Sequence, residues 1–171
     1  MSQPIETVWQ GKFITVRKQG TWEYVGRARD IHAAVILAVE AGEVLLVEQY
    51  RVPLGRVCIE LPAGLVGDET EGEAITASAA RELEEETGYR PARVEVIGEF
   101  CSSPGMVSES FTLVRASELT KVGDGGGVPG EDITVHRVAL AQLPDFIAAK
   151  RAEGLAVDVK LLLLLGASIL T

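Results

Sequence analysis

The sequence predicts one domain of the α/β or α+β class, a sandwich of helices around a mixed β-sheet. The chain has 171 residues, of which 47% are hydrophobic. This is close to the roughly 150 residues of a typical domain and is enough for one core. Segments with strand patterns alternate with a few helical segments, which favours helices packed on a sheet. Neighbouring strands joined by short turns make the expected sheet mixed rather than wholly parallel.

The first 30 residues predict a β-hairpin region. Residues 11–18 alternate between apolar and polar side chains, Gln19-Gly20 is typical of a turn, and residues 21–25 alternate again. We therefore divide the chain into a strand region over residues 1–30 and a main domain over residues 31–171. Residues 1–13 contain no basic segment followed by an apolar run, so no signal peptide is expected.

The main domain begins with two expected strands and a long helix. Residues 33–39 form a continuous apolar run typical of a buried strand, residues 40–43 form a turn, and residues 44–50 form a second strand. Residues 73–87 contain no Gly or Pro and are rich in Ala, Leu and Glu, which predicts a helix capped by Gly88. The other expected elements are strands at 94–100, 110–115 and 133–138, a Gly-rich loop at 122–130, and helices at 141–153 and 157–170, separated at Gly154.

Cysteine usage and hydropathy favour a cytoplasmic protein. Cys58 and Cys101 each lie among apolar residues, so both are expected to be buried structural thiols and not a disulfide or a zinc site. The most apolar stretch, residues 161–165, continues to Leu170 but is shorter than the roughly 20 residues that cross a bilayer. We therefore expect no membrane association.

Charge is the most informative property of the chain. The net charge is -9, which excludes a generic binder of nucleic acids or anionic membranes. On the expected helix, Glu82, Glu85 and Glu86 share one face near the C-terminal end, where the helix dipole disfavours carboxylates. From the residues alone two explanations stay open. Either this is a solvated acidic face, or the carboxylates bind a divalent cation, and oxygen ligands favour Mg²⁺ or Mn²⁺.

The residues around this helix resemble the Nudix box and favour the metal-binding explanation. The box is Gly-x5-Glu-x7-Arg-Glu-U-x-Glu-Glu-x-Gly-U, where U is a bulky apolar residue. Glu73 and residues 81–89, Arg-Glu-Leu-Glu-Glu-Glu-Thr-Gly-Tyr, match it. Gly67 has the five-residue spacing to Glu73, whereas Pro-Ala-Gly, which usually provides the first glycine, ends at Gly64. We interpret residues 67–72 as carrying a short insertion.

Further segments resemble the ADP-ribose pyrophosphatase branch of that family. They are residues 46–51 followed by Glu60-Leu-Pro-Ala-Gly64, then Ser103-Pro104-Gly105, in which Pro104 stands sixteen residues after Gly88, and Trp22-Glu-Tyr-Val-x-Arg27. The resemblance implies a Nudix α/β/α sandwich over residues 31–171. It also implies a homodimer, with the region 1–30 contributing to dimerisation and substrate binding through N-terminal strands that the subunits exchange.

The resemblance also implies a role for each matching acidic residue. Glu82 and Glu86 would hold Mg²⁺, with Mn²⁺ as a substitute, together with the carbonyl of Ala63. Glu85 would be a further ligand or would hold a water, and Arg81 would brace Glu85, with Glu73 also in a bracing position. Glu131, on the Gly-rich loop, would be the general base, and the glycines of that loop would permit it to close over substrate. From the residues alone Asp132 is an equally reachable base.

Substrate contacts are implied in the same way. Arg51 and Arg27 would face the diphosphate or the terminal ribose phosphate. Trp22 would stack on the adenine, and Phe13, from the same chain or from the second subunit, would cover its other face. Glu109 would contact ribose or adenine.

These roles predict a Mg²⁺-dependent hydrolase that converts ADP-ribose to AMP and ribose 5-phosphate. The alternatives are a hydrolase of another nucleoside diphosphate sugar, such as GDP-mannose or ADP-glucose, and a Nudix-like module that binds ADP-ribose without cleaving it.

Overall fold

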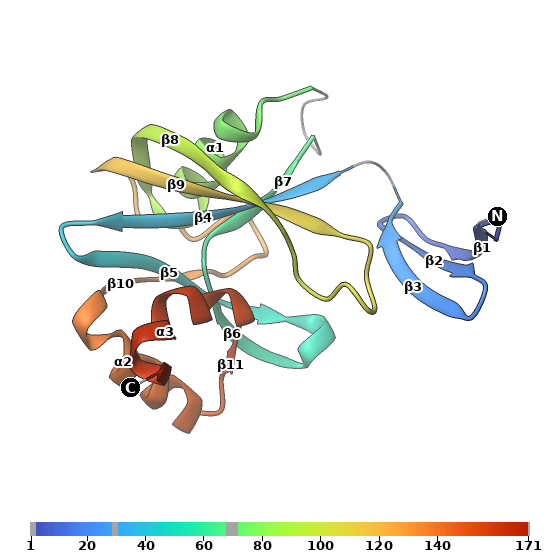
Figure 1. The fold of residues 1–171 in the computed structure, drawn as a ribbon. Coiled ribbons are helices and arrows are strands. Elements are labelled where there is room, and N and C mark those ends of the chain that lie inside the picture. Colours follow the sequence, from blue (N-terminus) through green and yellow to red (C-terminus); the bar gives the residue numbers. More distant parts are fainter. Residues whose placement is uncertain (1–2, 29–30, 68–71, 171) are drawn as a thin grey trace.

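The N-terminal region forms a small antiparallel sheet that stands beside the main body (Figure 1). The structure is a computed structural model and describes residues 3–28, 31–67 and 72–170. Strands β2 (Ile14–Gln19) and β3 (Trp22–Arg27) pair in the predicted hairpin, with Gly20 in the left-handed region at φ 64°. Strand β1 (Glu6–Gln10), which the sequence pattern did not predict, completes the sheet by pairing with β2.

The main sheet has eight strands and is mixed, as predicted. The strand order is β11-β6-β5-β4-β9-β8, with β10 also pairing with β5 and β7 with β4. The β4–β9 and β11–β6 pairs are parallel and the others are antiparallel. The strands are β4 (His32–Glu40), β5 (Glu43–Arg51), β6 (Arg56–Glu60), β7 (Ala63–Val66), β8 (Tyr89–Cys101), β9 (Ser110–Lys121), β10 (Thr134–Ala139) and β11 (Ala156–Val157).

Helices cover both faces of this sheet, which confirms the predicted sandwich. Helix α1 (Ile75–Thr87) lies on one face, and α2 (Leu143–Ala152) and α3 (Leu162–Leu170) lie on the other (Figure 1). Short 3-10 turns η1 (Val52–Leu54), η2 (Leu140–Gln142) and η3 (Val159–Leu161) complete the fold. Helix α1 begins two residues later than the expected helix over 73–87, because Ala74 adopts an extended cap conformation.

The predicted helix over 157–170 is wrong in its first half. Val157 pairs with Ile59 in β11, and the Asp158 carboxylate accepts a hydrogen bond from the Lys160 backbone N–H at 2.8 Å. This cap starts η3, and α3 follows only at Leu162. The predicted separation of the two C-terminal helices at Gly154 is confirmed, and Gly154 has φ 92°.

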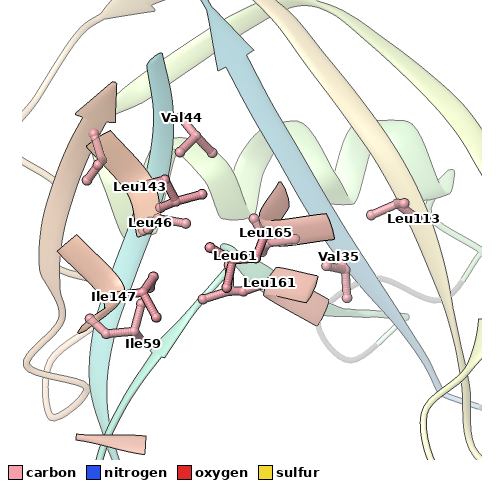
Figure 2. Packing of buried hydrophobic residues seen from close by; sticks show 11 residues of the cluster. Val35, Val44, Leu46, Ile59, Leu61, Leu113, Leu143, Ile147, Leu161 and Leu165 are labelled. Atoms are coloured by element: carbon pink, nitrogen blue, oxygen red, sulfur yellow. The ribbon is translucent and has the colours of Figure 1, made fainter. Parts of the chain in front are cut away.

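Strand β4 separates two apolar cores, which explains its continuous apolar run. Ala34, Ile36 and Ala38 point toward Ala79 and Leu83 of α1. Val35 points the other way, into a cluster that α2, η3 and α3 close with Leu143, Ile147, Leu161 and Leu165 (Figure 2). A strand buried on both faces cannot alternate in polarity. Leu83 is fully buried, so α1 is held against the sheet with a fixed rotation, and Glu86, one turn further along, is buried as well.

The two cysteines differ in their exposure to solvent. Cys58 is buried, as predicted, and burial raises the pKa of its thiol to about 12. The prediction for Cys101 is wrong, because this residue is exposed. It ends β8, which lies at the edge of the sheet and is mostly exposed over its C-terminal half. Within the described residues, no helix combines the length and apolar character needed to cross a membrane.

Candidate active site

A cavity of about 550 Å³ opens between α1, the β8–β9 loop and the C-terminal segment before α3. Eight of the residues that the sequence predicted for the site line this cavity: Arg27, Arg51, Ala63, Glu82, Glu85, Glu86, Glu109 and Glu131. They come from β3, β5, β7, α1, the β8–β9 loop and the Gly-rich loop. Residues spread over more than 100 positions of sequence are thus brought to one place.

The acidic face of α1 is partly neutralised by one arginine. Arg81 lies 3.0 Å from Glu82 and 3.1 Å from Glu85, and its guanidinium is also 3.5 Å from Glu73. The Arg81–Glu85 pair is the one expected from their i,i+4 spacing. Arg81 therefore lies among three of the carboxylates that the Nudix-like pattern selects, and it orients them as well as offsetting their charge.

Glu86 is the most buried of these carboxylates, with 6% of its surface exposed. Burial raises its pKa to about 8, and the negative charges of Glu82 and Glu131 add to the increase. One interaction acts in the opposite direction, because the backbone N–H of Ala63 donates to Glu86 Oε2 at 3.1 Å. A cation bound here would favour the ionised form of Glu86, since an opposite charge stabilises a carboxylate.

The strand end next to α1 has no room for a side chain at position 64. A Cβ built on Gly64 would collide with the carboxylate of Glu82. The glycine of Pro-Ala-Gly thus lets the β7 backbone approach this carboxylate, in the segment that also carries Ala63. Residues 68–71 of the interpreted insertion lie outside the described residues.

The donor set fits a hard divalent cation. Glu82, Glu85 and Glu86 are oxygen donors that line one cavity, and the backbone of Ala63 is hydrogen-bonded to Glu86. Within the described ranges, however, no three His, Cys, Asp or Glu side chains already converge closely enough to enclose a metal ion. The reason is visible in the ion pairs, since Arg81 holds Glu82 and Glu85. Coordination of one metal ion by Glu82 together with Glu86 therefore requires the Glu82 carboxylate to turn toward Glu86.

The Gly-rich loop is docked on the carbonyl end of α1. The N–H groups of Gly126 and Gly127 donate to the carbonyls of Glu86 and Glu85, at 2.9 and 3.0 Å. The N–H groups of Val122 and Gly123 donate to the carbonyl of Gly88, at 2.8 and 3.2 Å. The last carbonyls of a helix have no partner within the helix, so this loop satisfies them. It also places N–H dipoles at the helix end that carries the glutamates.

The docked loop brings Glu131 into the cavity. The Glu131 carboxylate accepts a hydrogen bond from the Val128 N–H at 3.0 Å and packs against Gly127. Its negative charge contributes to the raised pKa of Glu86. Asp132, which the residues alone left as an equal alternative, is not among the described residues that line the cavity. Of these two predicted candidates, Glu131 is therefore the one that lies at the cavity.

The arginines expected to bind substrate are held by carboxylates. Arg51 makes a two-point pair with Glu60, at 2.6 Å through Nε and 3.0 Å through Nη2, and this hydrogen bonding raises the arginine pKa. Arg27 pairs with Glu109 at 2.7 Å. Each pair fixes the plane of a guanidinium at the cavity wall. Glu109 thus has a structural partner in addition to the ribose or adenine contact predicted for it.

Lys160 and Phe111 are among the cavity residues to which the sequence assigned no role. Lys160 lines the cavity from η3, with its Nζ 2.7 Å from Asp158 and 5.7 Å from the centre of the Phe111 ring, which also lines the cavity. The prediction of a buried helix over 157–170 concealed Lys160. A charged residue directly before a long apolar run was the available signal.

The aromatic residues predicted to hold the adenine do not reach the cavity within one chain. Trp22 is 63% exposed and Phe13 57% exposed on the N-terminal sheet, and neither is among the described lining residues. The sheet itself is connected to the main body through Val25, which exchanges backbone hydrogen bonds with Met106 and Ser108 at 3.0 and 2.9 Å. The adenine contact stays a prediction.

Comparison with known proteins agrees with the box of acidic residues. Residues 28–156 match the model of the NUDIX domain. The chain is 37% identical over 128 residues to a putative nudix hydrolase 2 of Caenorhabditis elegans, covering 64% of this chain and 56% of that protein. It is 39% identical over 87 residues to the ADP-ribose pyrophosphatase of Bacillus subtilis, covering 51% and 45%. The chain spans about half the length of these two relatives.

Two further matches cover more of the chain. A GDP-mannose pyrophosphatase of Cronobacter sakazakii is 34% identical over 164 residues, covering 87% of this chain and 80% of that protein. The crystal structure of an ADP compounds hydrolase superposes with a TM-score of 0.70 at 22% identity, covering 86% of this chain and 82% of that one. At that identity the structural match establishes the fold alone.

The burial of Glu86 predicts a pH-dependent stability of the metal-free protein. The folded-state pKa of about 8 lies above the ordinary value of 4.5, so the folded state binds more protons between these values. The contribution of this proton binding to the free energy of unfolding is fully present below pH 4.5 and is lost as the pH rises toward 8. In EDTA, the free energy of unfolding of the unaltered protein should therefore fall relative to Glu86→Gln by about 1 kcal/mol per pH unit in this window. Urea unfolding from pH 5 to 8 measures the difference, and parallel curves for the two proteins would contradict the prediction.

Proposed function

The chain belongs to the NUDIX family, and from this membership and its carboxylate-lined cavity we propose that it is a Mg²⁺-dependent hydrolase of ADP-ribose. The products are AMP and ribose 5-phosphate. One observation carries the proposal: Glu82, Glu85, Glu86 and Glu131 line the same cavity as Arg27 and Arg51. Hydrolysis of a diphosphate needs this combination of metal-binding carboxylates, a base and cations for the phosphates.

The residues of the cavity would have separate roles in the reaction. Glu82, Glu86 and the Ala63 carbonyl would hold Mg²⁺, with Glu85 as a further ligand or holding a water, and Arg81 keeps Glu85 in place. When bound, Mg²⁺ supplies neutralisation of the charge on the phosphoryl oxygens. Glu131 accepts a proton from the attacking water as the water oxygen bonds to one phosphorus. The bond from that phosphorus to the bridging oxygen breaks, and the two phosphate monoesters leave. Arg51 and Arg27 donate hydrogen bonds to the phosphate oxygens.

The proposed substrate preference is supported by several relatives that share one name. The matching proteins of Bacillus subtilis, Saccharomyces cerevisiae and Mycobacterium tuberculosis are each named ADP-ribose pyrophosphatase. A second candidate is hydrolysis of GDP-mannose, because the relative with that activity in its name matches over 87% of this chain. A module that binds without hydrolysis is disfavoured, since all three carboxylates of the acidic face are present.

A substrate panel tests the proposal. With Mg²⁺ present, kcat/KM should be highest for ADP-ribose among ADP-ribose, ADP-glucose and GDP-mannose, and chromatography should find AMP and ribose 5-phosphate in equal amounts. EDTA should abolish turnover and Mn²⁺ should restore it. A higher kcat/KM for GDP-mannose would select the second candidate. Tight binding of ADP-ribose without turnover in saturating Mg²⁺ would instead support the binding module.

Neighbouring glutamates on α1 provide a matched pair of variants. Glu86→Gln should lower kcat by at least about 100-fold, since removal of a metal ligand forfeits several kcal/mol of charge stabilisation in the transition state. Glu84→Gln is the control, because Glu84 pairs with Arg90 on the outer side of the helix and does not line the cavity. Initial rates at saturating Mg²⁺ measure both. Equal activity of the two variants would contradict the assigned metal role.

The N-terminal sheet favours a homodimer in which one subunit completes the site of the other. Its exposed apolar side chains include Ile5, Val8, Trp9, Phe13, Ile14 and Trp22. So many on one small sheet are typical of a surface that another protein covers. We assign residues 1–30 to dimerisation and substrate binding, with Trp22 and Phe13 enclosing adenine once a second subunit brings them to a cavity. A cytoplasmic location stays a prediction.

The role of Trp22 is tested through the Michaelis constant. Trp22→Ala should raise KM for ADP-ribose about tenfold with kcat retained, because an aromatic stack on a base contributes roughly 1–3 kcal/mol. Trp22→Phe keeps an aromatic face and should recover most of the affinity. Analytical ultracentrifugation should find dimers of the unaltered protein. A monomer with full activity, or an unchanged KM for Trp22→Ala, would refute the assignment.

A further inference from the structure

The glycines of the loop over residues 122–130 do more than give it freedom to move. Gly125 has φ 73°, and a Cβ built on it would lie 2.5 Å from the carbonyl carbon of Thr87 and 2.6 Å from the carbonyl oxygen of Glu86. Contacts this short to backbone atoms cannot be relieved by a side-chain rotation. Only a glycine lets the loop backbone reach the end of α1.

The close approach at Gly125 is what brings the next two amides into range. Gly126 and Gly127 donate their N–H groups to the carbonyls of Glu86 and Glu85, and these are the residues whose side chains form the acidic face. The Val128 N–H, one residue further, donates to the Glu131 carboxylate. Hydrogen bonds from three successive backbone N–H groups, those of Gly126, Gly127 and Val128, therefore connect the end of α1 to the Glu131 carboxylate.

We propose that Gly125 is a positioning residue, which holds the loop against the carbonyl end of α1 and thereby fixes Glu131 over the carboxylates of the acidic face. It acts through Glu131 and touches no substrate. The inference rests on the proposed function, because the position of Glu131 matters for turnover only if Glu131 is the base of the hydrolysis. It also limits movement of the loop during turnover to the part that follows Gly127.

Alanine variants of two neighbouring glycines distinguish the effect of the close backbone approach from the effect of a positive φ. Gly126 also has a positive φ, 111°, but a Cβ there would meet only the Ile133 carbonyl oxygen at 3.9 Å. Gly125→Ala should lower kcat for ADP-ribose about 100-fold, as expected when a catalytic group is misplaced by about 1 Å, with KM and Mg²⁺ affinity unchanged. Gly126→Ala should retain much more of the activity. Equal losses in the two variants, or full activity of Gly125→Ala, would overturn the proposal.

A double variant tests whether Gly125 acts through Glu131. If it does, Gly125→Ala combined with Glu131→Gln should be no slower than Glu131→Gln alone, because the base is already lost. A further large loss in the double variant would overturn the proposed route. Thermal unfolding of each variant verifies that it is folded.

Amide hydrogen exchange tests the docking independently of activity. The Gly126 and Gly127 amides should exchange slowly in the unaltered protein, and Gly125→Ala should make them exchange quickly. Fast exchange in the unaltered protein would overturn the docking itself. Absence of all hydrolysis by the unaltered protein would overturn the proposed function instead, and the exchange rates would still decide whether the loop is docked.

Discussion

The site depends on how negative charge is tolerated at the carbonyl end of α1. Glu82, Glu84, Glu85 and Glu86 lie in its last turn and a half, where the helix dipole opposes them. Three compensations are present. Arg81 pairs with Glu82 and Glu85, Arg90 pairs with Glu84, and N–H groups of the Gly-rich loop cover the helix end. Glu86 pairs with neither arginine among the described contacts, and burial raises its pKa to about 8. It is the position where a bound cation would relieve the most unfavourable charge.

The fold is arranged to keep this charge in one place. Leu83 anchors α1 on the sheet, so its rotation is fixed, and Gly64 lets the end of β7 approach the Glu82 carboxylate. The Gly-rich loop then closes the open end of α1 and delivers Glu131 to the same cavity. The two apolar cores on either side of β4 make this framework rigid. Carboxylates from separate parts of the chain can therefore be held near each other although they repel.

Much of the architecture could be predicted because its signals are periodic or local. The spacing of Glu82, Glu85 and Glu86 on a helix, and the apolar run of β4, are visible in the sequence and were placed correctly. Tertiary contacts were not predictable in the same way. The η3 turn that carries Lys160 depends on the pairing of Val157 with Ile59, and the exposure of Cys101 depends on the position of β8 at the sheet edge. The docking of Gly125 depends on contacts with a helix that is distant in the sequence.

The net charge of -9 is compatible with an anionic substrate because the acidic residues are not spread evenly over the site. Cations at Arg27, Arg51 and Lys160 share the cavity with the glutamates, and a divalent metal ion would reverse the sign of the acidic wall. The most direct test is the anomalous diffraction of a crystal soaked with Mn²⁺ and a non-hydrolysable ADP-ribose analogue. A manganese peak bound by Glu82, Glu86 and the Ala63 carbonyl is the expected result. A manganese peak elsewhere, with Arg81 still paired to Glu82, would contradict the metal-binding role of the acidic face.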